Sequence, residues 1–188
     1  MRITSACLGP LATNGYLIEL DSGNLLIDPA EDGPALQKLI GGRSIDWVVL
    51  THGHFDHIGG AWAVPDAQIA MHRDDLPFVD QAHPNRDTIH RFIQAGDELL
   101  PGVETMHLPG HSPGSIALKI EDALFVGDVL FAGSIGRTDL PSGSMKVLSE
   151  SLRRLIDLPG DFDVYPGHGD FTTLNCERQT NPYLRMMR

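Results

Sequence analysis

The residues best suited to chemistry lie in one short segment, residues 51–60, which reads T-H-G-H-F-D-H-I-G-G. It contains four potential metal ligands within six residues: His52, His54, Asp56 and His57. Because the segment follows the apolar run 47–50, we expect it in a loop at the end of a buried strand. Imidazole and carboxylate donors favour zinc, iron or manganese over calcium. A polar turn is the alternative, but so dense a cluster favours a metal site.

Three later segments each place one candidate ligand in a loop rich in glycine or proline after an apolar stretch. They read L-P-G-H-S-P-G around His111, F-V-G-D-V-L-F around Asp128 and V-Y-P-G-H-G-D around His168. Taken singly, the two histidines could be turn residues, and Asp128 could cap a turn through its side-chain oxygens. Together with the first segment they bring the candidate ligands to seven, which is enough for two metal ions.

The pattern H-x-H-x-D-H at residues 52–57 closely resembles the signature of the metallo-β-lactamase superfamily, and the resemblance extends over nearly the whole chain. It implies an α+β fold, a four-layer αββα sandwich in which two mixed sheets pack face to face with helices outside. It also implies two divalent metal ions, zinc in the first place, with iron or manganese as alternatives. One ion would take His52, His54 and His111, the other would take Asp56, His57 and His168, and Asp128 would bridge them.

Two further segments are similar to the short glyoxalase II-like proteins, which are hydroxyacylglutathione hydrolase-like. They are F-A-G-S-I-G-R-T-D-L-P at 131–141 and T-T-L-N-C-E-R-Q-T-N-P-Y-L at 172–184. These proteins lack the helical domain with which full-length glyoxalase II binds glutathione. The secreted zinc β-lactamases usually have cysteine at the position of Asp128, and flavodiiron proteins replace the second histidine of the signature, here His54, with glutamate. Both observations argue against those two groups.

The resemblance implies a metal-dependent hydrolase that cleaves a thioester such as S-D-lactoylglutathione by attack of a metal-bridging hydroxide. Asp56 and Asp128 are the expected catalytic residues. Arg137 is the expected contact for an anionic substrate group, although it could instead pair with Asp139. Thr51 and Asp139 are candidates to orient the imidazole ligands, or are ordinary turn residues.

Two other functions stay open at this point. The segment G-R-T-D at 136–139 also occurs in persulfide dioxygenases, which hold one iron through residues that correspond to His52, His111 and Asp128. A mononuclear iron persulfide dioxygenase is therefore the main alternative. The second alternative is a non-catalytic domain in which the metals only stabilise the loops.

Composition sets broad limits on the protein. A chain of 188 residues with 41% hydrophobic residues suits one globular domain spanning residues 1–188. A net charge of −11 without any basic run disfavours a nucleic-acid partner, and no apolar stretch is long enough for a membrane span. The two cysteines, Cys7 and Cys176, cannot form a disulfide framework, and the N-terminus has no secretory apolar region, so we expect a cytoplasmic protein. The expected partner is a small-molecule thioester, and the oligomeric state is unknown.

The apolar patterns predict strand clusters with helices outside them, which is a layered α+β sandwich. The predicted strands are 2–7, 14–20, 24–28, 46–50, 68–71, 103–108, 115–121, 124–126 and 163–165. The predicted helices are one with Asp32 as its cap and Pro34 in its first turn, a short one at 58–64, two short ones within 73–96, and further ones at 145–158 and 177–187.

Overall fold

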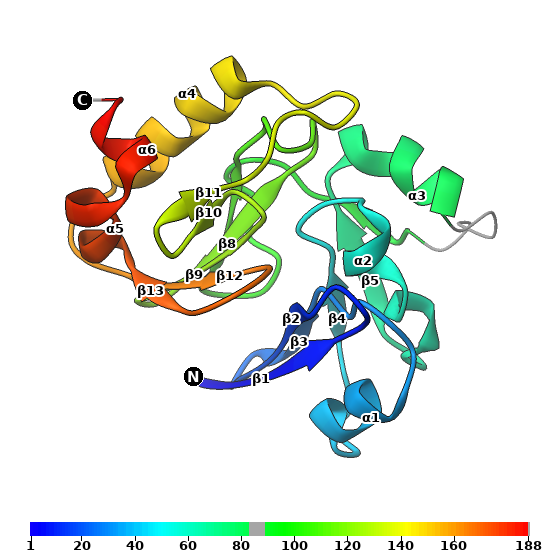
Figure 1. The fold of residues 1–188 in the computed structure, drawn as a ribbon. Coiled ribbons are helices and arrows are strands. Elements are labelled where there is room, and N and C mark those ends of the chain that lie inside the picture. Colours follow the sequence, from blue (N-terminus) through cyan, green and yellow to red (C-terminus); the bar gives the residue numbers. More distant parts are fainter. Residues whose placement is uncertain (83–88, 188) are drawn as a thin grey trace. The chain divides into compact units, whose positions relative to one another are not determined.

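The computed structural model describes residues 1–82 and 89–187, and the chain divides into two compact units. Unit 1 is Met1–Ile93 and unit 2 is Gln94–Arg188. Each unit has its own mixed sheet and its own helices (Figure 1). The predicted α+β class with two mixed sheets is thus confirmed, whereas the single domain over 1–188 stays a prediction.

The sheet of unit 1 brings together the two chain segments that follow residues 27 and 49, at the carboxyl ends of two neighbouring strands. Its strands are hydrogen-bonded in sequence order: β1 (Arg2–Leu8), β2 (Thr13–Leu20), β3 (Gly23–Ile27), β4 (Trp47–Val49), β5 (Gln68–Met71) and β6 (Arg91–Phe92). The first three strands are antiparallel, and β3 to β6 are parallel. Since Ile27 pairs with Val49, the residues that follow these two strands, Asp28 and the histidine-rich loop, leave the sheet side by side.

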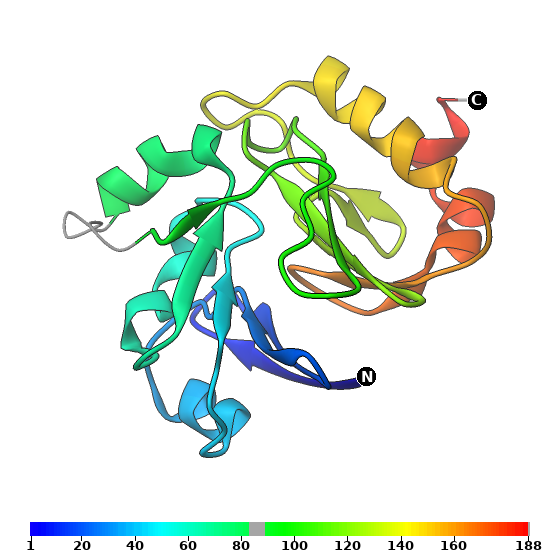
Figure 2. The ribbon, with the colours of Figure 1, turned by 180° about the vertical axis from the view of Figure 1, so that it is seen from behind.

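One face of this sheet is covered by the helices of unit 1. They are α1 (Pro34–Ile40), α2 (Phe55–Ile58), the 3₁₀ turns η1 (Ala61–Ala63) and η2 (Arg73–Asp75), and α3 (Leu76–Ala82). Figure 2 shows α1 and α3 beside the strands of this sheet, and Leu36 of α1, Ile58 of α2 and Val79 of α3 are buried in one apolar cluster with Leu26 and Val48. Burial of this cluster fixes the base of the histidine-rich loop.

Two helix predictions in unit 1 are wrong in their details. The helix predicted at 58–64 begins at Phe55 and ends at Ile58, with a separate 3₁₀ turn after it. Gly59 and Gly60 follow the helix and pass against the backbone of Ala30 and Glu31, where a Cβ atom would clash with a carbonyl oxygen. Helix α1 has Gly33 rather than Asp32 at its N-cap, with no side-chain cap. The prediction at 58–64 missed the contact of these two glycines with a distant chain segment.

The sheet of unit 2 has the order β13-β12-β9-β8-β7. Its strands are β7 (Val103–His107), β8 (Ile116–Ile120), β9 (Ala123–Gly127), β12 (Asp163–Pro166) and β13 (Thr172–Thr173), and a separate hairpin is formed by β10 (Leu130–Phe131) and β11 (Ser134–Ile135). Strand β12 is parallel to β9, with Pro166 opposite Gly127. Asp128 and His168, which come just after these ends, are therefore neighbours at the same edge.

Three helices pack against the sheet of unit 2: α4 (Met145–Ile156), α5 (Leu174–Thr180) and α6 (Pro182–Arg185) (Figure 1). The helix predicted at 145–158 is confirmed, and its Ser144 cap accepts a hydrogen bond from Val147 N. The single helix predicted at 177–187 is wrong, because Pro182 cannot continue a helix and Asn181 Oδ1 starts a new one by accepting bonds from Tyr183 N and Leu184 N.

Of the two short helices predicted within 73–96, the structure has η2 and α3, and residues 83–88 of that stretch lie outside the described residues. Within the described parts of the chain, no helix has both the length and the apolar character that a bilayer crossing requires.

Candidate metal centre

The histidine-rich loop of unit 1 follows β4 and runs into α2. His54 is the N-cap of α2, so Asp56 and His57 lie in its first turn. His52 and His57 are almost fully buried, at 1% and 0% exposure. The ring centroid of His52 lies 4.7 Å from that of His54 and 4.1 Å from that of His57. Three imidazoles packed this closely suit neutral rings that bind metal ions rather than protonated rings, whose positive charges would repel one another.

A buried carboxylate, Asp28, organises this loop. It follows β3 with a positive φ of 47° and is 1% exposed. Its Oδ1 accepts a hydrogen bond from Thr51 N at 2.8 Å, and its Oδ2 accepts one from Thr51 Oγ1 at 2.6 Å. Its Oδ2 also lies 2.8 Å from His57 Nδ1. A left-handed aspartate costs backbone energy, which these three bonds offset.

These bonds assign a proton to one nitrogen of each of two rings. His57 Nδ1 must donate to Asp28, so Nε2 of His57 keeps its lone pair. The single proton of the Thr51 hydroxyl goes to Asp28, so at 3.2 Å the hydroxyl oxygen accepts from His52 Nδ1. Nε2 of His52 is then the metal-binding atom. The sequence prediction of Thr51 as an orienting residue agrees with this geometry, but Asp28 was not predicted.

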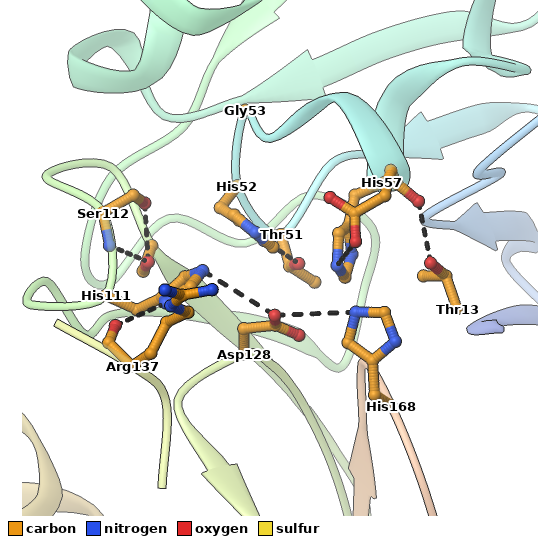
Figure 3. A network of polar contacts seen from close by, with 12 residues as sticks. Thr13, Thr51, His52, Gly53, His57, His111, Ser112, Asp128, Arg137 and His168 are labelled. Atoms are coloured by element: carbon orange, nitrogen blue, oxygen red, sulfur yellow. Dashed lines mark hydrogen bonds and ion pairs between the residues drawn. The ribbon is translucent and has the colours of Figure 1, made fainter. Parts of the chain in front are cut away.

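Two further contacts fix the position of the loop. Gly53 N donates to the buried Asp75 Oδ2 at 2.8 Å, and a Cβ atom at Gly53 would lie 2.6 Å from Asp75 O. Thr13 Oγ1 donates to the backbone oxygen of Asp56 at 2.9 Å (Figure 3). In the sequence, the Asp28-Pro29 step after a strand is the only local sign that Asp28 could have a structural role. Asp75 and Thr13 have no such sign.

Unit 2 brings together the other three predicted ligands. Asp128 Oδ2 lies 3.7 Å from His111 Nε2 and 3.6 Å from His168 Nε2 (Figure 3). Two donors bound at about 2.1 Å to the same tetrahedral ion are roughly 3.4 Å apart. These separations therefore suit pairs of donors that share a metal ion better than direct hydrogen bonds. In unit 1, Asp56 Oδ2 and His57 Nε2 are 3.7 Å apart in the same way.

The imidazole of His111 is oriented by a backbone carbonyl. His111 Nδ1 lies 2.8 Å from the oxygen of Arg137 and must donate to it, which again leaves Nε2 as the metal-binding atom. Gly136, the residue before Arg137, lies against Asp128 and His111 so closely that a Cβ atom there would overlap the oxygen of Asp128. The β10–β11 hairpin therefore joins the ligand Asp128 at one end to the carbonyl that orients His111 at the other.

A buried polar pair holds the tip of this hairpin. Glu177 Oε2 accepts from Gly133 N at 2.9 Å and from Asn181 Nδ2 at 2.8 Å, and Oε1 accepts from Thr172 Oγ1 at 2.7 Å. Asn181 Nδ2 also donates to Ser134 O at 3.0 Å. Glu177 and Asn181 are 2% and 0% exposed. They belong to the C-terminal segment whose resemblance to the short glyoxalase II-like proteins had suggested no role.

Replacing Glu177 by glutamine should lower both the metal affinity, about tenfold, and the stability of the fold. The carboxylate accepts from three donors, and in the variant the NH₂ group of glutamine would face at least one of them in place of an accepting oxygen. Chelator competition measures the first effect and thermal unfolding the second. Arg178→Ala is the control: its guanidinium binds the oxygens of Ile156, Leu158 and Gly160 but not the hairpin. If the two variants lose metal affinity equally at equal loss of stability, the hairpin does not position the ligands.

Arg137, the predicted substrate contact, is paired through its side chain with Asp139. Nε and the terminal Nη2 donate to the two carboxylate oxygens, each at 2.7 Å. These bonds lower the pKa of Asp139 to about 2 and raise the pKa of Arg137. Both side chains are well exposed, so the pair contributes little to stability. The role of Arg137 toward a substrate and that of Asp139 toward the imidazoles stay predictions.

The donor set fits divalent metal ions of the zinc and iron type. It consists of imidazole nitrogens and carboxylate oxygens, and His52, His57 and His111 each have Nδ1 engaged so that Nε2 is available. Asp28, His52 and His57 also lie close enough together to be a ligand group of their own. We assign Asp28 an orienting role instead, because its 2.8 Å separation from His57 Nδ1 is that of a hydrogen bond.

Comparison with known proteins agrees with the donor set. The family model of the metallo-β-lactamase superfamily matches residues 8–168, which contain all seven predicted ligands. The chain belongs to this superfamily. The superfamily resemblance drawn from the H-x-H-x-D-H signature is thereby confirmed, and with it the divalent-metal character of the site and membership of a superfamily of metallohydrolases.

Individual relatives narrow the position of the chain within the superfamily. It is 36% identical to the hydroxyacylglutathione hydrolase GloC of Haemophilus influenzae over 85% of this chain and 86% of that protein. It is 34% identical to the probable metallo-hydrolase YqgX of Bacillus subtilis over 94% of both. Among solved structures, TTHA1623 in a di-iron-bound form has a TM-score of 0.88 and 38% identity, over 96% of this chain and 100% of that one. This metallo-β-lactamase superfamily chain is therefore glyoxalase II-like.

Proposed function

We propose that the protein is a dinuclear metallohydrolase that cleaves a thioester such as S-D-lactoylglutathione. As the superfamily resemblance implies, one ion would be held by His52, His54 and His111 and the other by Asp56, His57 and His168, with Asp128 bridging. The observation that carries the proposal is the placement of Asp128 Oδ2 at 3.7 and 3.6 Å from two imidazole nitrogens. The 36% identity to a hydroxyacylglutathione hydrolase supports the thioester.

Two divalent ions held by these residues would supply the nucleophile, because they lower the pKa of a bound water from about 16 towards 7, and would polarise the scissile carbonyl. The chain's part is to hold the donors in fixed orientations and to orient the nucleophile. Asp56 is the carboxylate that we propose orients the nucleophile. It lies in the first turn of α2, and the imidazole of the next residue, His57, is fixed by Asp28. A thiolate leaving group needs little protonation, so the site can work without a separate general acid.

The substrate's anionic end would meet Arg137. Its guanidinium already binds one carboxylate, that of Asp139, in a bidentate geometry with both hydrogen bonds at 2.7 Å. A substrate carboxylate would take the place of Asp139 on an exposed arginine. We also propose a cytoplasmic location, which the two free, exposed cysteines support.

Elemental analysis combined with thioester hydrolysis tests this function. We expect about two metal ions per chain and hydrolysis of S-D-lactoylglutathione that a chelator abolishes. One iron per chain, with oxygen uptake on glutathione persulfide, would contradict the hydrolase and favour the persulfide dioxygenase. Full metal content with no hydrolysis of thioesters, lactones or phosphodiesters would mean that the metals only stabilise the loops.

A further inference from the structure

We infer that the site prefers thioesters that carry an apolar group of roughly four to six carbons, which is seated in a pocket beside His54. The inference rests on the proposed function and goes beyond it, since lactoyl and glutathionyl groups are both polar. The pocket lies within unit 1, between the histidine-rich loop and α3, and has a volume of about 280 Å³. Pockets for whole ligands measure about 300–1,000 Å³, so this one suits a part of a substrate.

The lining of the pocket is mostly apolar. It consists of Gly53, His54, Phe55, Phe78, Gln81 and Ala82. Among the described residues, no Asp, Glu, Lys or Arg lines it, although the chain as a whole carries a charge of −11. A charged tripeptide would find no ionic partner there, whereas an alkyl or phenyl group would lose its hydration shell against two aromatic rings.

Phe55 is the first sign that this surface receives a ligand. It stands between the predicted ligands His54 and Asp56, and it is 63% exposed although it is a large apolar side chain. Helix α2 already buries Ile58 in the core, so Phe55 adds nothing to that packing. An exposed phenyl ring in a metal-binding loop gives up hydrophobic stabilisation of the fold, and contact with a bound apolar group would recover it.

Phe78 ties the pocket to the metal site. Its ring meets the ring of His54 edge to face, with centroids 5.1 Å apart and planes at 76°. One wall of the pocket is thus a proposed metal ligand, and the next wall is the ring that packs against it. A carbonyl group that reaches the ions can place a substituent of a few atoms against Phe78. The pocket is therefore positioned to select the group attached to the thioester.

Two series of thioesters test the pocket with purified, metal-loaded protein. In the acyl series the thiol is N-acetylcysteamine and the acyl group is acetyl, butyryl or hexanoyl. In the thiol series the acyl group is acetyl and the thiol is methanethiol, butanethiol or hexanethiol. We expect kcat/KM to rise about threefold per added methylene in one series. That series identifies which side of the thioester enters the pocket. Flat profiles in both series overturn the inference.

Phe78→Ala should remove the chain-length dependence, so that the ratio of kcat/KM for the longest and the shortest substrate falls to about one, whatever the rate with the shortest substrate. Phe171→Ala is the matched control, because Phe171 is an exposed phenylalanine of unit 2 that contacts Tyr165. An unchanged chain-length profile in the Phe78 variant contradicts the inference.

Binding separates this inference from the proposed function. The dissociation constants of S-methyl and S-hexyl thioethers of N-acetylcysteamine are measured by calorimetry, which needs no hydrolysis. Tighter binding of the hexyl compound to the wild type but not to Phe78→Ala supports the pocket even if every thioester is inert. Equal binding of the two thioethers to the wild type overturns the pocket, whatever the activity.

Discussion

Replacing Asp128 by asparagine should reduce thioester hydrolysis by about 10³-fold and metal content from two ions per chain towards one. The change removes a negative charge but keeps the size of the side chain, so the hairpin that begins after it should still form. Asp128 is the residue that unit 2 places within 3.7 Å of both His111 Nε2 and His168 Nε2. An amide bridges two cations poorly, because it is neutral and its oxygen is a weaker donor than that of a carboxylate.

Steady-state kinetics and elemental analysis on the same preparation measure the two effects. Asp122→Asn is the matched control: Asp122 is exposed in the turn between β8 and β9, and its backbone oxygen accepts a hydrogen bond from Asp163 N. The control should keep the wild-type rate and metal content. Two ions per chain and wild-type turnover in the Asp128 variant would rule out its bridging role.

The candidate metal ligands could be proposed from the sequence because each carries its own local signal. His52, His54, Asp56 and His57 are close in sequence, and His111, Asp128 and His168 each follow an apolar strand. Strand ends of parallel neighbours meet at one sheet edge, so the loops that follow them hold functional residues. The strands β9 and β12 illustrate this, since Gly127 pairs with Pro166 just before Asp128 and His168.

Apart from Thr51, the residues that orient the candidate ligands could not be predicted in this way. Asp28 meets Thr51 and His57 across 23 and 29 residues of sequence, and only the parallel pairing of β3 with β4 brings them together. Glu177 reaches Gly133 across 44 residues. No local pattern of apolar and polar residues encodes such pairs. The contact of Gly59 and Gly60 with residues 30 and 31, in the stretch where a helix at 58–64 was predicted, is another pair of this kind.

Replacing Asp28 by asparagine should weaken metal binding by about 10- to 100-fold and lower activity while the fold is kept. Asparagine adopts a positive φ readily, so the backbone at this position should not change. The wild-type carboxylate accepts all three of its bonds, at 2.8, 2.6 and 2.8 Å. An amide has one oxygen, and if that oxygen stays with Thr51, its NH₂ group faces His57 Nδ1. His57 must then accept at Nδ1 and carry its proton on Nε2, the atom that should bind the metal.

Asp46→Asn is the matched control for this variant. The Asp46 carboxylate also accepts a backbone bond between the two chain segments that form β3 and β4, from Asn24 N at 2.7 Å, but at the opposite end of those strands. Both variants should unfold at slightly lower temperatures, yet only Asp28→Asn should lose metal affinity in chelator competition. Substitution with cobalt gives a second readout, because a changed His57 ligand alters the visible absorption of the ion. A wild-type cobalt spectrum and metal affinity in Asp28→Asn would show that the carboxylate supports the fold alone, since the imidazole then keeps its lone pair at Nε2 without it.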